Sequence, residues 1–378
     1  MDLFAVAAPG TETLLQRELA ALGIAGRAVA GGVELRGDIA TIWRANLESR
    51  LASRLLLRLG RFQTEHLNEL EKLTAKLDVV PFLRADQPLS VRATCRKSRI
   101  YHSGAAEERV HRALAKKLGA ELVPARANLD EDEAPPQTVL VRFEHDVCTL
   151  SLDTSGAHLH KRGYRLETAK APMRETLAAA LLAEAGYRED LALVDPLCGS
   201  GTFAIEAALI ATRTAPGRLR SFAFERWPSH DARAMRQLRD AAEARRRTAP
   251  APIVASDRDE GAVRAARRNA ERAQVEIDVR HHALSEARPP SRHGLLLTNP
   301  PYGARVGDPA RLRDLYATLG RLASGPFAEW AVGFVSTDPR LAQASGLAVT
   351  RTSPLLPHGG LKVKLYLRDA AGVPTRDR

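Results

Sequence analysis

The stretch VDPLCGSGTFAIEAALIA, residues 194–211, decides the fold of this chain. An apolar strand ends in Asp195, a tight turn carries Gly199 and Gly201, and an apolar helical stretch begins at once. Glycines at such a turn let the backbone approach a ligand closely at the amino end of the helix. The turn is not a Walker phosphate loop, since no Gly-Lys-Ser/Thr follows, and it lacks the third glycine of the dinucleotide fingerprint. It therefore predicts a strand–loop–helix unit of a parallel sheet, with a ligand at the loop.

Strands and helices alternate through the second half of the chain, as is typical of a doubly wound parallel sheet. Right-handed crossovers place the carboxyl ends of such strands along one edge. We expect strands at LALVDP (191–196), PIVASD (252–257), IDVRHHA (277–283), GLLLTN (294–299), WAVGFVS (330–336) and KVKLYL (362–367). We expect helices at residues 173–186, 201–212, 259–273 and 309–323.

Two further strand ends carry polar side chains. PIVASD ends in Asp257, a carboxylate that suits hydrogen bonds from two ribose hydroxyls. The strand in LLLTNPPYGARVG (295–307) stops at two prolines, which cannot donate to a sheet ladder and which stiffen Asn299 and Pro300. Alone, NPPY is equally well an ordinary turn. After a glycine loop and an acid in this order, it indicates a nucleoside site beside a rigid polar platform.

The first half of the chain mixes short strands and helices in the manner of small α+β units. We expect strands in 3–7, 26–37, 89–96 and 137–156, and helices in 11–23, 39–60, 66–77 and 105–119. The acidic stretch NLDEDEAPPQ (128–137) is interpreted as a solvated loop.

Bulk composition narrows the class of protein. With 378 residues, two or three domains are expected. A net charge of +11 favours a polyanionic partner, although a high arginine content can also reflect genome composition. Three scattered cysteines indicate neither a disulfide framework nor a zinc ribbon. No apolar run is long enough to span a bilayer and no secretory signal is evident, so a cytoplasmic location is expected.

Taken together, the glycine loop, the acid and NPPY resemble the class I S-adenosylmethionine-dependent methyltransferases that act on exocyclic amino groups. SVRATCRKSRIYHSG (90–104) resembles a THUMP RNA-binding domain, and residues 158–182 resemble the cofactor-closing segment of THUMP-containing RNA methyltransferases. PGRLRSFAFERWPSHD (216–231) and LPHGGLKVKLYL (356–367) resemble the bacterial 23S rRNA guanine-N2 methyltransferases of the RlmL type.

The resemblance implies an α/β chain with three parts. These are a ferredoxin-like α+β unit at 1–62, a THUMP α/β domain at 63–160, and a doubly wound, Rossmann-like methyltransferase domain at 161–378. It implies S-adenosylmethionine as cofactor, RNA as partner, and no metal or membrane. The resemblance also implies a cofactor site made of Arg174, Glu175, Thr176, Asp195, Cys198, Gly199, Ser200, Gly201, Asp257, Arg258, His282, Ala283 and Asn299.

By the same resemblance, Asn299, Pro300, Pro301 and Tyr302 are the catalytic residues. The Asn299 side-chain carbonyl and the Pro300 backbone carbonyl accept the two hydrogens of the target amine, and Tyr302 stacks on the extruded base. Family members carry an acid near the position of His282 that contacts the adenine amine. RHHALSEA (280–287) is interpreted as offering no such acid.

Several residues have a second interpretation. Cys198 suggests a nucleophile, but packing of the turn is the more usual role. His281 and His282 suggest a metal, but no other ligand accompanies them at suitable spacing. Glu175 fits a charge at a helix amino end as well as it fits a cofactor contact. A stretch with basic and aromatic side chains is either a solvated strand end or an RNA-binding site; its members are Arg96, Lys97, Arg99, Tyr101 and His102.

The leading functional prediction is an RNA methyltransferase that forms N2-methylguanosine, most simply in 23S rRNA. A tRNA guanine-N2 methyltransferase shares the same parts. N6-adenine methylation of DNA also uses NPPY, but the THUMP-like half argues against it. A catalytically silent RNA-binding factor would not need an intact glycine loop, Asp257 and NPPY.

Overall fold

The computed structural model describes residues 1–119, 136–167, 173–302 and 309–370. The chain forms two compact units, and each draws on both halves of the sequence. The first unit contains 1–7, 15–159 and 220–240; the second contains 8–14, 160–219 and 241–378. Of the acidic stretch at 128–137, residues 128–135 lie outside the described residues.

A seven-stranded sheet in the order β2-β3-β1-β4-β7-β6-β5 forms the centre of the first unit. Its strand β4 pairs with β1 on one side and with β7 on the other, both antiparallel. The expected ferredoxin-like and THUMP parts therefore share one sheet, and the three-part division stays a prediction. The elements are β1 (Asp2–Val6), α1 (Glu12–Ala21), β2 (Gly26–Val29), β3 (Gly32–Arg36), α2 (Ile39–Glu48), β4 (Arg54–Gln63), α3 (Leu67–Ala75), β5 (Leu89–Arg96), α4 (Ser103–Leu118), β6 (Gln137–Glu144) and β7 (Val147–Asp153).

The helix expected over 39–60 is wrong in its second half. α2 ends at Glu48, where Ser49 turns the backbone to an extended conformation, and β4 begins at Arg54. Leu55, Leu56 and Leu57 are buried because this strand has neighbours on both sides. A short apolar run of this kind fits a buried helix and a central strand equally well, so only the pairing decides it.

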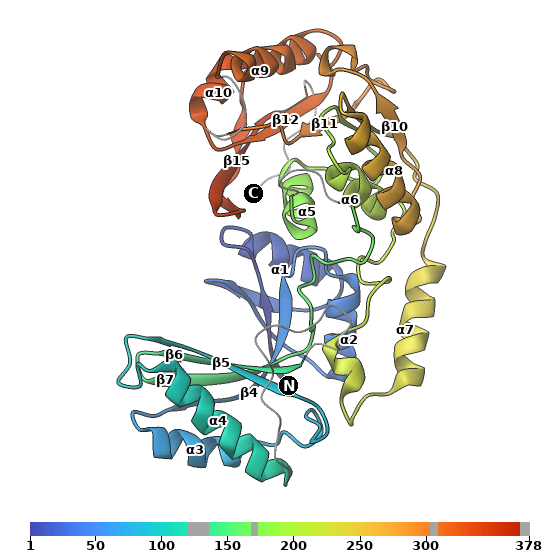
Figure 1. The fold of residues 1–378 in the computed structure, drawn as a ribbon. Helices are drawn as coiled ribbons and strands as arrows, with labels where there is room; N and C mark the ends of the chain where they lie inside the picture. The colour runs from blue at the N-terminus through green and yellow to red at the C-terminus, as the bar shows by residue number, and fades with distance from the viewer. Residues whose placement is uncertain (120–135, 168–172, 303–308, 371–378) are drawn as a thin grey trace. The chain divides into compact units, whose positions relative to one another are not determined.

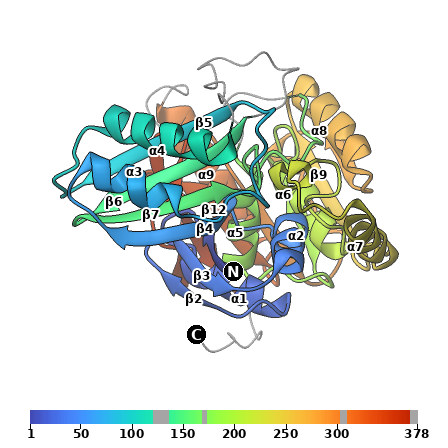
Figure 2. The ribbon, with the colours of Figure 1, turned by 90° about the horizontal axis from the view of Figure 1, so that it is seen from below.

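Helices α3 and α4 lie side by side against the β5–β7 part of this sheet (Figure 2). Their apolar stripes supply Leu70, Val110 and Leu114 to the core. His102 accepts a hydrogen bond from the backbone of Ala105 and caps α4, while Gly119 ends it in a left-handed conformation.

A strap from the second half of the sequence, residues 220–240, completes the first unit. It contains η1 (Ala223–Arg226) and most of α7 (Ala232–Ala244). Phe224 is fully buried and stacks with Trp43 of α2, with ring centroids 6.3 Å apart. Arg220 donates hydrogen bonds to the carbonyls of Ser155, Ala157 and His158, at 3.0, 2.5 and 2.7 Å. The strap lies between α6 (Thr202–Ala211) and β9 (Ile253–Asp257) in the sequence, but its side chains belong to the core of the first unit.

The second unit is doubly wound around an eight-stranded sheet in the order β10-β9-β8-β11-β12-β15-β13, with β14 paired to β15 (Figure 1). Its elements are α5 (Glu175–Glu184), β8 (Ala192–Asp195), α6 (Thr202–Ala211), β9 (Ile253–Asp257), α8 (Glu260–Ala273), β10 (Asp278–His281), η2 (Leu284–Glu286), β11 (Gly294–Thr298), α9 (Pro309–Ser324), β12 (Ala331–Ser336), α10 (Pro339–Ala344), β13 (Arg351–Thr352), β14 (Leu356–His358) and β15 (Leu361–Arg368). All six strands expected in this half are confirmed, as are the four helices.

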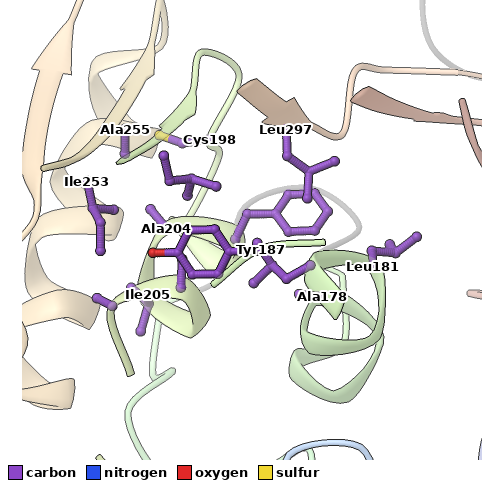
Figure 3. Packing of buried hydrophobic residues seen from close by; sticks show 14 of the residues in the cluster. Ala178, Leu181, Tyr187, Cys198, Ala204, Ile205, Ile253, Ala255 and Leu297 are labelled. Atoms are coloured by element: carbon purple, nitrogen blue, oxygen red, sulfur yellow. The ribbon is translucent and has the colours of Figure 1, made fainter. Parts of the chain in front are cut away.

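Side chains alternate across this sheet into two cores. Leu193 and Leu297 belong to the core that contains α5, α6 and α8, while Val194 and Leu296 belong to the core that contains α9 and α10. Figure 3 shows the first core from close by, with Leu297, Ala204 and Leu181 in one cluster. Burial on both faces explains why the strands are continuous apolar runs.

The strap generates a stability prediction. Phe224→Ala should lower the free energy of unfolding of the first unit by about 3–5 kcal/mol, because it removes a buried aromatic ring that the core cannot refill. Denaturant unfolding followed by tryptophan fluorescence measures this. The control is Arg236→Ala, at an exposed position of α7. Equal stability of the two variants would contradict a structural role for the strap.

Candidate active site

The carboxyl ends of three neighbouring strands meet at the centre of the second sheet. β8 lies between β9 and β11 and is parallel to both. The chain runs from β8 through α6 to β9 on one side, and reaches β11 on the other side later. This reversal of strand order opens the crevice in which doubly wound proteins bind ligands.

The glycine loop adopts the backbone that only glycine takes readily. Gly199 and Gly201 have φ of 52° and 85°. A Cβ on Gly201 would lie 3.1 Å from the Cβ of Ala266 on α8, so a side chain there would also crowd the helix. Gly201 stands at the N-cap of α6, and no side chain of the described residues caps this amino end. Its first backbone N–H groups are therefore the natural place for an anionic or polar ligand group.

Asp257 joins the end of β9 to the glycine loop. One carboxylate oxygen accepts a hydrogen bond from the Gly199 backbone at 3.0 Å, and the other accepts from the Asp259 backbone at 3.0 Å. The side chain remains partly exposed, so both oxygens keep lone pairs for a ligand. Asp257 can therefore hold the glycine loop and still accept hydrogen bonds from a ribose.

Asp195 lies beneath this surface rather than on it. Its side chain is 2% exposed and accepts hydrogen bonds from the Thr298 hydroxyl at 2.7 Å and the Leu197 backbone at 3.3 Å. Burial raises the pKa of Asp195 to about 7, and the charge of Asp257 adds to the rise. The contact joins β8 to β11, and sequence reasoning missed Thr298 because a buried threonine carries no distinctive signal.

Asn299 follows β11 directly and forms the polar platform with its neighbours. Pro300 is buried, while Asn299, Pro301 and Tyr302 are partly buried. Asn299 Oδ1 and the Tyr302 hydroxyl are both buried without a hydrogen-bond partner in the described part of the chain. Burial raises the pKa of Tyr302 to about 12; Asn299 is near enough to oppose this in part, although the pair lacks full hydrogen-bond geometry. A buried acceptor without a donor is costly unless a ligand supplies one.

Comparisons with known proteins identify this arrangement. The RMKL-like methyltransferase domain model matches residues 162–357, and the RlmL ferredoxin-like domain model matches residues 2–56. The chain belongs to the RMKL-like methyltransferase family. The expected Rossmann-like methyltransferase fold and the ferredoxin-like start are thereby confirmed, while no comparison tests the THUMP assignment.

Individual relatives cover almost the whole of this chain. It is 38% identical, over 98% of its length, to the ribosomal RNA large subunit methyltransferase K/L of Syntrophotalea carbinolica, but spans 54% of that protein. It is 34% identical to slr0064 of Synechocystis, a provisionally assigned RNA methyltransferase, with 96% of both chains covered. SMU.472, a provisionally assigned methyltransferase solved in complex with SAH, superposes with a TM-score of 0.88 at 30% identity, over 99% of both chains.

The segment before α5 is held by buried charges in the methyltransferase domain. Glu175 is 3% exposed and pairs with Arg165, with Oε1 to Nε at 3.3 Å. Arg165 also donates to the Thr202 hydroxyl, at 2.8 Å, at the start of α6. Burial raises the pKa of Glu175 to about 7, against the pull of Arg165. These contacts favour a structural role for Glu175, whereas Arg174 is exposed and Thr176 is partly buried at the same helix start.

The segment after β10 contains an acid that the sequence interpretation overlooked. Glu286 accepts a hydrogen bond from the backbone of Ala283 at 2.7 Å, so RHHALSEA does place a carboxylate beside this stretch. His282 precedes Ala283, and the backbone N–H of His282 donates to the Asp257 carbonyl at 3.2 Å. Arg258 is exposed. The acid was missed because η2 folds residue 286 back onto residue 283.

Cys198 is a packing residue in this domain. It is 7% exposed, lies among Ala255, Leu297 and other apolar side chains (Figure 3), and burial raises the pKa of its thiol well above the usual value. Ser200 is also buried. In the described ranges, no group of three or more His, Cys, Asp or Glu side chains is placed to hold a metal ion. No described helix is both long and apolar enough to cross a membrane.

The predicted RNA-binding residues lie in the first unit, in the turn between β5 and α4. Arg96, Lys97 and Tyr101 are exposed. Arg99 pairs with Glu65 at 2.5 Å, and His102 caps α4. Two of the five expected residues thus also have structural contacts.

The buried carboxyl of Asp195 generates a pH prediction. Because its folded pKa of about 7 exceeds the usual 3.8, the unfolded chain loses this proton first as pH rises. The free energy of unfolding should fall from pH 4 to 7 by up to about 1.4 kcal/mol per pH unit. Asp195→Asn should remove this contribution, as measured by urea unfolding across that range. Asp314→Asn, at an exposed position of α9, is the control. Identical pH profiles for Asp195→Asn and the wild type would contradict the assignment.

Proposed function

We propose that the protein is an S-adenosylmethionine-dependent RNA methyltransferase that forms N2-methylguanosine, with 23S rRNA as its substrate. The observation that carries the proposal is the buried Asn299 Oδ1, which has no hydrogen-bond partner among the described residues, at the crevice formed by the ends of β8, β9 and β11. An acceptor in this position suits a substrate that brings N–H groups, as an exocyclic amine does.

The crevice fits the proposed cofactor. Gly199 and Gly201 leave its floor free of side chains, the amino end of α6 has no side-chain cap among the described residues, and Asp257 offers carboxylate lone pairs to ribose hydroxyls. Ala283 and Glu286 belong to the segment that follows β10, the strand that pairs with β9 and its end at Asp257. When bound, S-adenosylmethionine supplies an electrophilic methyl group.

The residues of the platform would prepare the amine for attack. The lone pair of a guanine N2 amine is delocalised into the base, which makes it a weak nucleophile. Hydrogen bonds from its two N–H groups to Asn299 Oδ1 and the Pro300 carbonyl favour a pyramidal nitrogen with a localised lone pair. Two prolines hold these acceptors in place, so little reorganisation is needed as charge develops. The ring of Tyr302 supports the face of the base.

RNA as the substrate class is supported by charge and by relatives. The net charge of +11 suits a polyanion, and the exposed Arg96 and Lys97 lie beside the exposed ring of Tyr101. The K/L relatives are named for large-subunit ribosomal RNA, and this chain spans about half their length. We therefore propose rRNA as substrate, and with it a cytoplasmic location. Methylation of tRNA is the alternative outcome of the substrate test.

The platform generates a kinetic prediction. Asn299→Ala should lower the single-turnover rate of methyl transfer to rRNA by roughly 10²–10³, since it removes one preorganised polar group at the reacting centre. Affinity for RNA and cofactor should change little. Mass spectrometry identifies the product nucleoside, and Gln237→Ala, an exposed amide on α7, is the control. A wild-type rate for Asn299→Ala would overturn the mechanism, whereas N6-methyladenosine or a tRNA-only product would overturn the substrate.

Asp257 generates a binding prediction. Asp257→Ala should weaken S-adenosylmethionine binding at least tenfold, about 1.4 kcal/mol, because it removes the ribose acceptor and frees the glycine loop. Titration calorimetry measures the affinity. Asp259→Ala serves as the matched control, since Asp259 caps α8 through Gly261 and Ala262. Unchanged affinity in a folded Asp257→Ala variant would exclude the ribose contact.

A further inference from the structure

A hairpin made by β14 and β15 extends past the carboxyl edge of the methyltransferase sheet. Thr298 at the end of β11 is level with Phe334 of β12, and Ser336, two residues further, pairs with Lys364 of β15. Because β15 is antiparallel to β12, residues 361–363 lie beyond that edge, as Pro301 and Tyr302 do. The hairpin therefore stands beside the platform.

The root of the hairpin is fixed and its turn is tight. Leu356 and Val363 are buried in the same core as Leu297. His358 pairs with Leu361 across a two-residue connection, Gly359–Gly360, whose φ angles of 54° and 83° suit a type I′ turn. A Cβ at either glycine would meet no atom of the described residues within 4 Å.

The inner side of the hairpin touches the platform. The ring of His358 meets the ring of Tyr302 edge to face, with centroids 6.4 Å apart. His358 is 9% exposed, and burial, together with the nearby charge of Arg174, lowers the pKa of its imidazole. This edge contact restrains the plane of the Tyr302 ring.

The exposed side chains at and near the tip of the hairpin are apolar and basic. Leu361 pairs with His358, shares its face of the hairpin and is 50% exposed, whereas the exposed Lys362 pairs with Pro357 and lies on the opposite face. Leu355, just before β14, is 52% exposed. A cation beside an apolar side chain suits an unstacked nucleotide, which offers a base face and a phosphate.

We propose that this hairpin is the wall of the acceptor site: His358 positions the Tyr302 ring against the target base, and Leu361 and Lys362 bind the nucleotide next to it. The inference rests on the proposed RNA methyltransferase function and adds the residues that hold the flanking strand. The hairpin is continuous with the platform through the His358–Tyr302 contact, and its charge complements a phosphate. A second copy of the chain is the competing occupant of the exposed leucines.

The test compares hairpin variants of the full-length protein in RNA binding and single-turnover methylation. His358→Ala should lower the rate at saturating RNA by roughly tenfold to a hundredfold with unchanged cofactor affinity, because Tyr302 loses its support. His358→Phe keeps an edge-to-face contact and should restore most of the rate, which a charge or proton-transfer role for His358 would not allow.

The tip variants should act on binding instead of rate. Leu361→Ser should weaken RNA affinity about fivefold. Lys362→Ala should also reduce the slope of log K against log salt by about 0.7, the value for one phosphate of a single strand. Matched controls lie at the opposite end of the sheet: Val349→Ser is an exposed apolar position near the end of β15, and Arg292→Ala is an exposed cation just before β11.

The outcomes separate this inference from the proposed function. The hairpin assignment alone is overturned if the wild type is active and three variants keep its methylation rate and RNA affinity: His358→Ala, Leu361→Ser and Lys362→Ala. A change of mass in sedimentation for Leu361→Ser, with RNA affinity intact, shows that a second copy is the occupant and also overturns it. A wild type that methylates no RNA overturns both proposals.

Discussion

The hydrogen bond from Thr298 to the buried carboxyl of Asp195 is the contact on which the site depends. It joins the ends of β8 and β11, the two strands between which the sheet reverses its order. Asp257 makes the corresponding link from β9 to the glycine loop. With both links in place, the glycine loop, Asp257 and Asn299 are held at fixed separations before any ligand arrives. Preorganisation of this kind is what lets a polar group favour a transition state.

Burial separates the groups that hold the site from those available to a ligand. Asp195, Glu175 and Cys198 are almost fully enclosed, and the partners of the two acids lie inside the protein. Asp257 is partly exposed, and Asn299 Oδ1 accepts no hydrogen bond from the part of the chain that the structure describes. A buried acceptor without a donor is costly, and a ligand that brings a donor would remove that cost.

The unit that carries the proposed RNA-binding residues needs the strap at 220–240 to complete its core. Phe224 and Arg220 complete the core of the first unit, although they lie between α6 and β9 in the sequence. A fragment cut at residue 160 lacks both. Its Trp43 would lose a stacked neighbour, and the carbonyls of Ser155 and Ala157 would lose their donors. The first unit is therefore a product of the whole chain, and cutting the chain at 160 leaves its core incomplete.

The sequence by itself determined the doubly wound half and the strand ends at which the candidate site residues stand. Strand ends marked by Asp195, Asp257 and Asn299 are local signals, because an apolar run followed by a polar residue or a proline fixes where a strand stops. Only the tertiary structure decided that 54–63 is a strand, that Asp195 and Glu175 turn inward, that Glu286 returns to Ala283, and that His358 meets Tyr302. Each of these depends on a partner far away in the chain or on a turn whose direction periodicity does not encode. Burial, pairing and charge compensation belong to the packed molecule and not to any one segment of it.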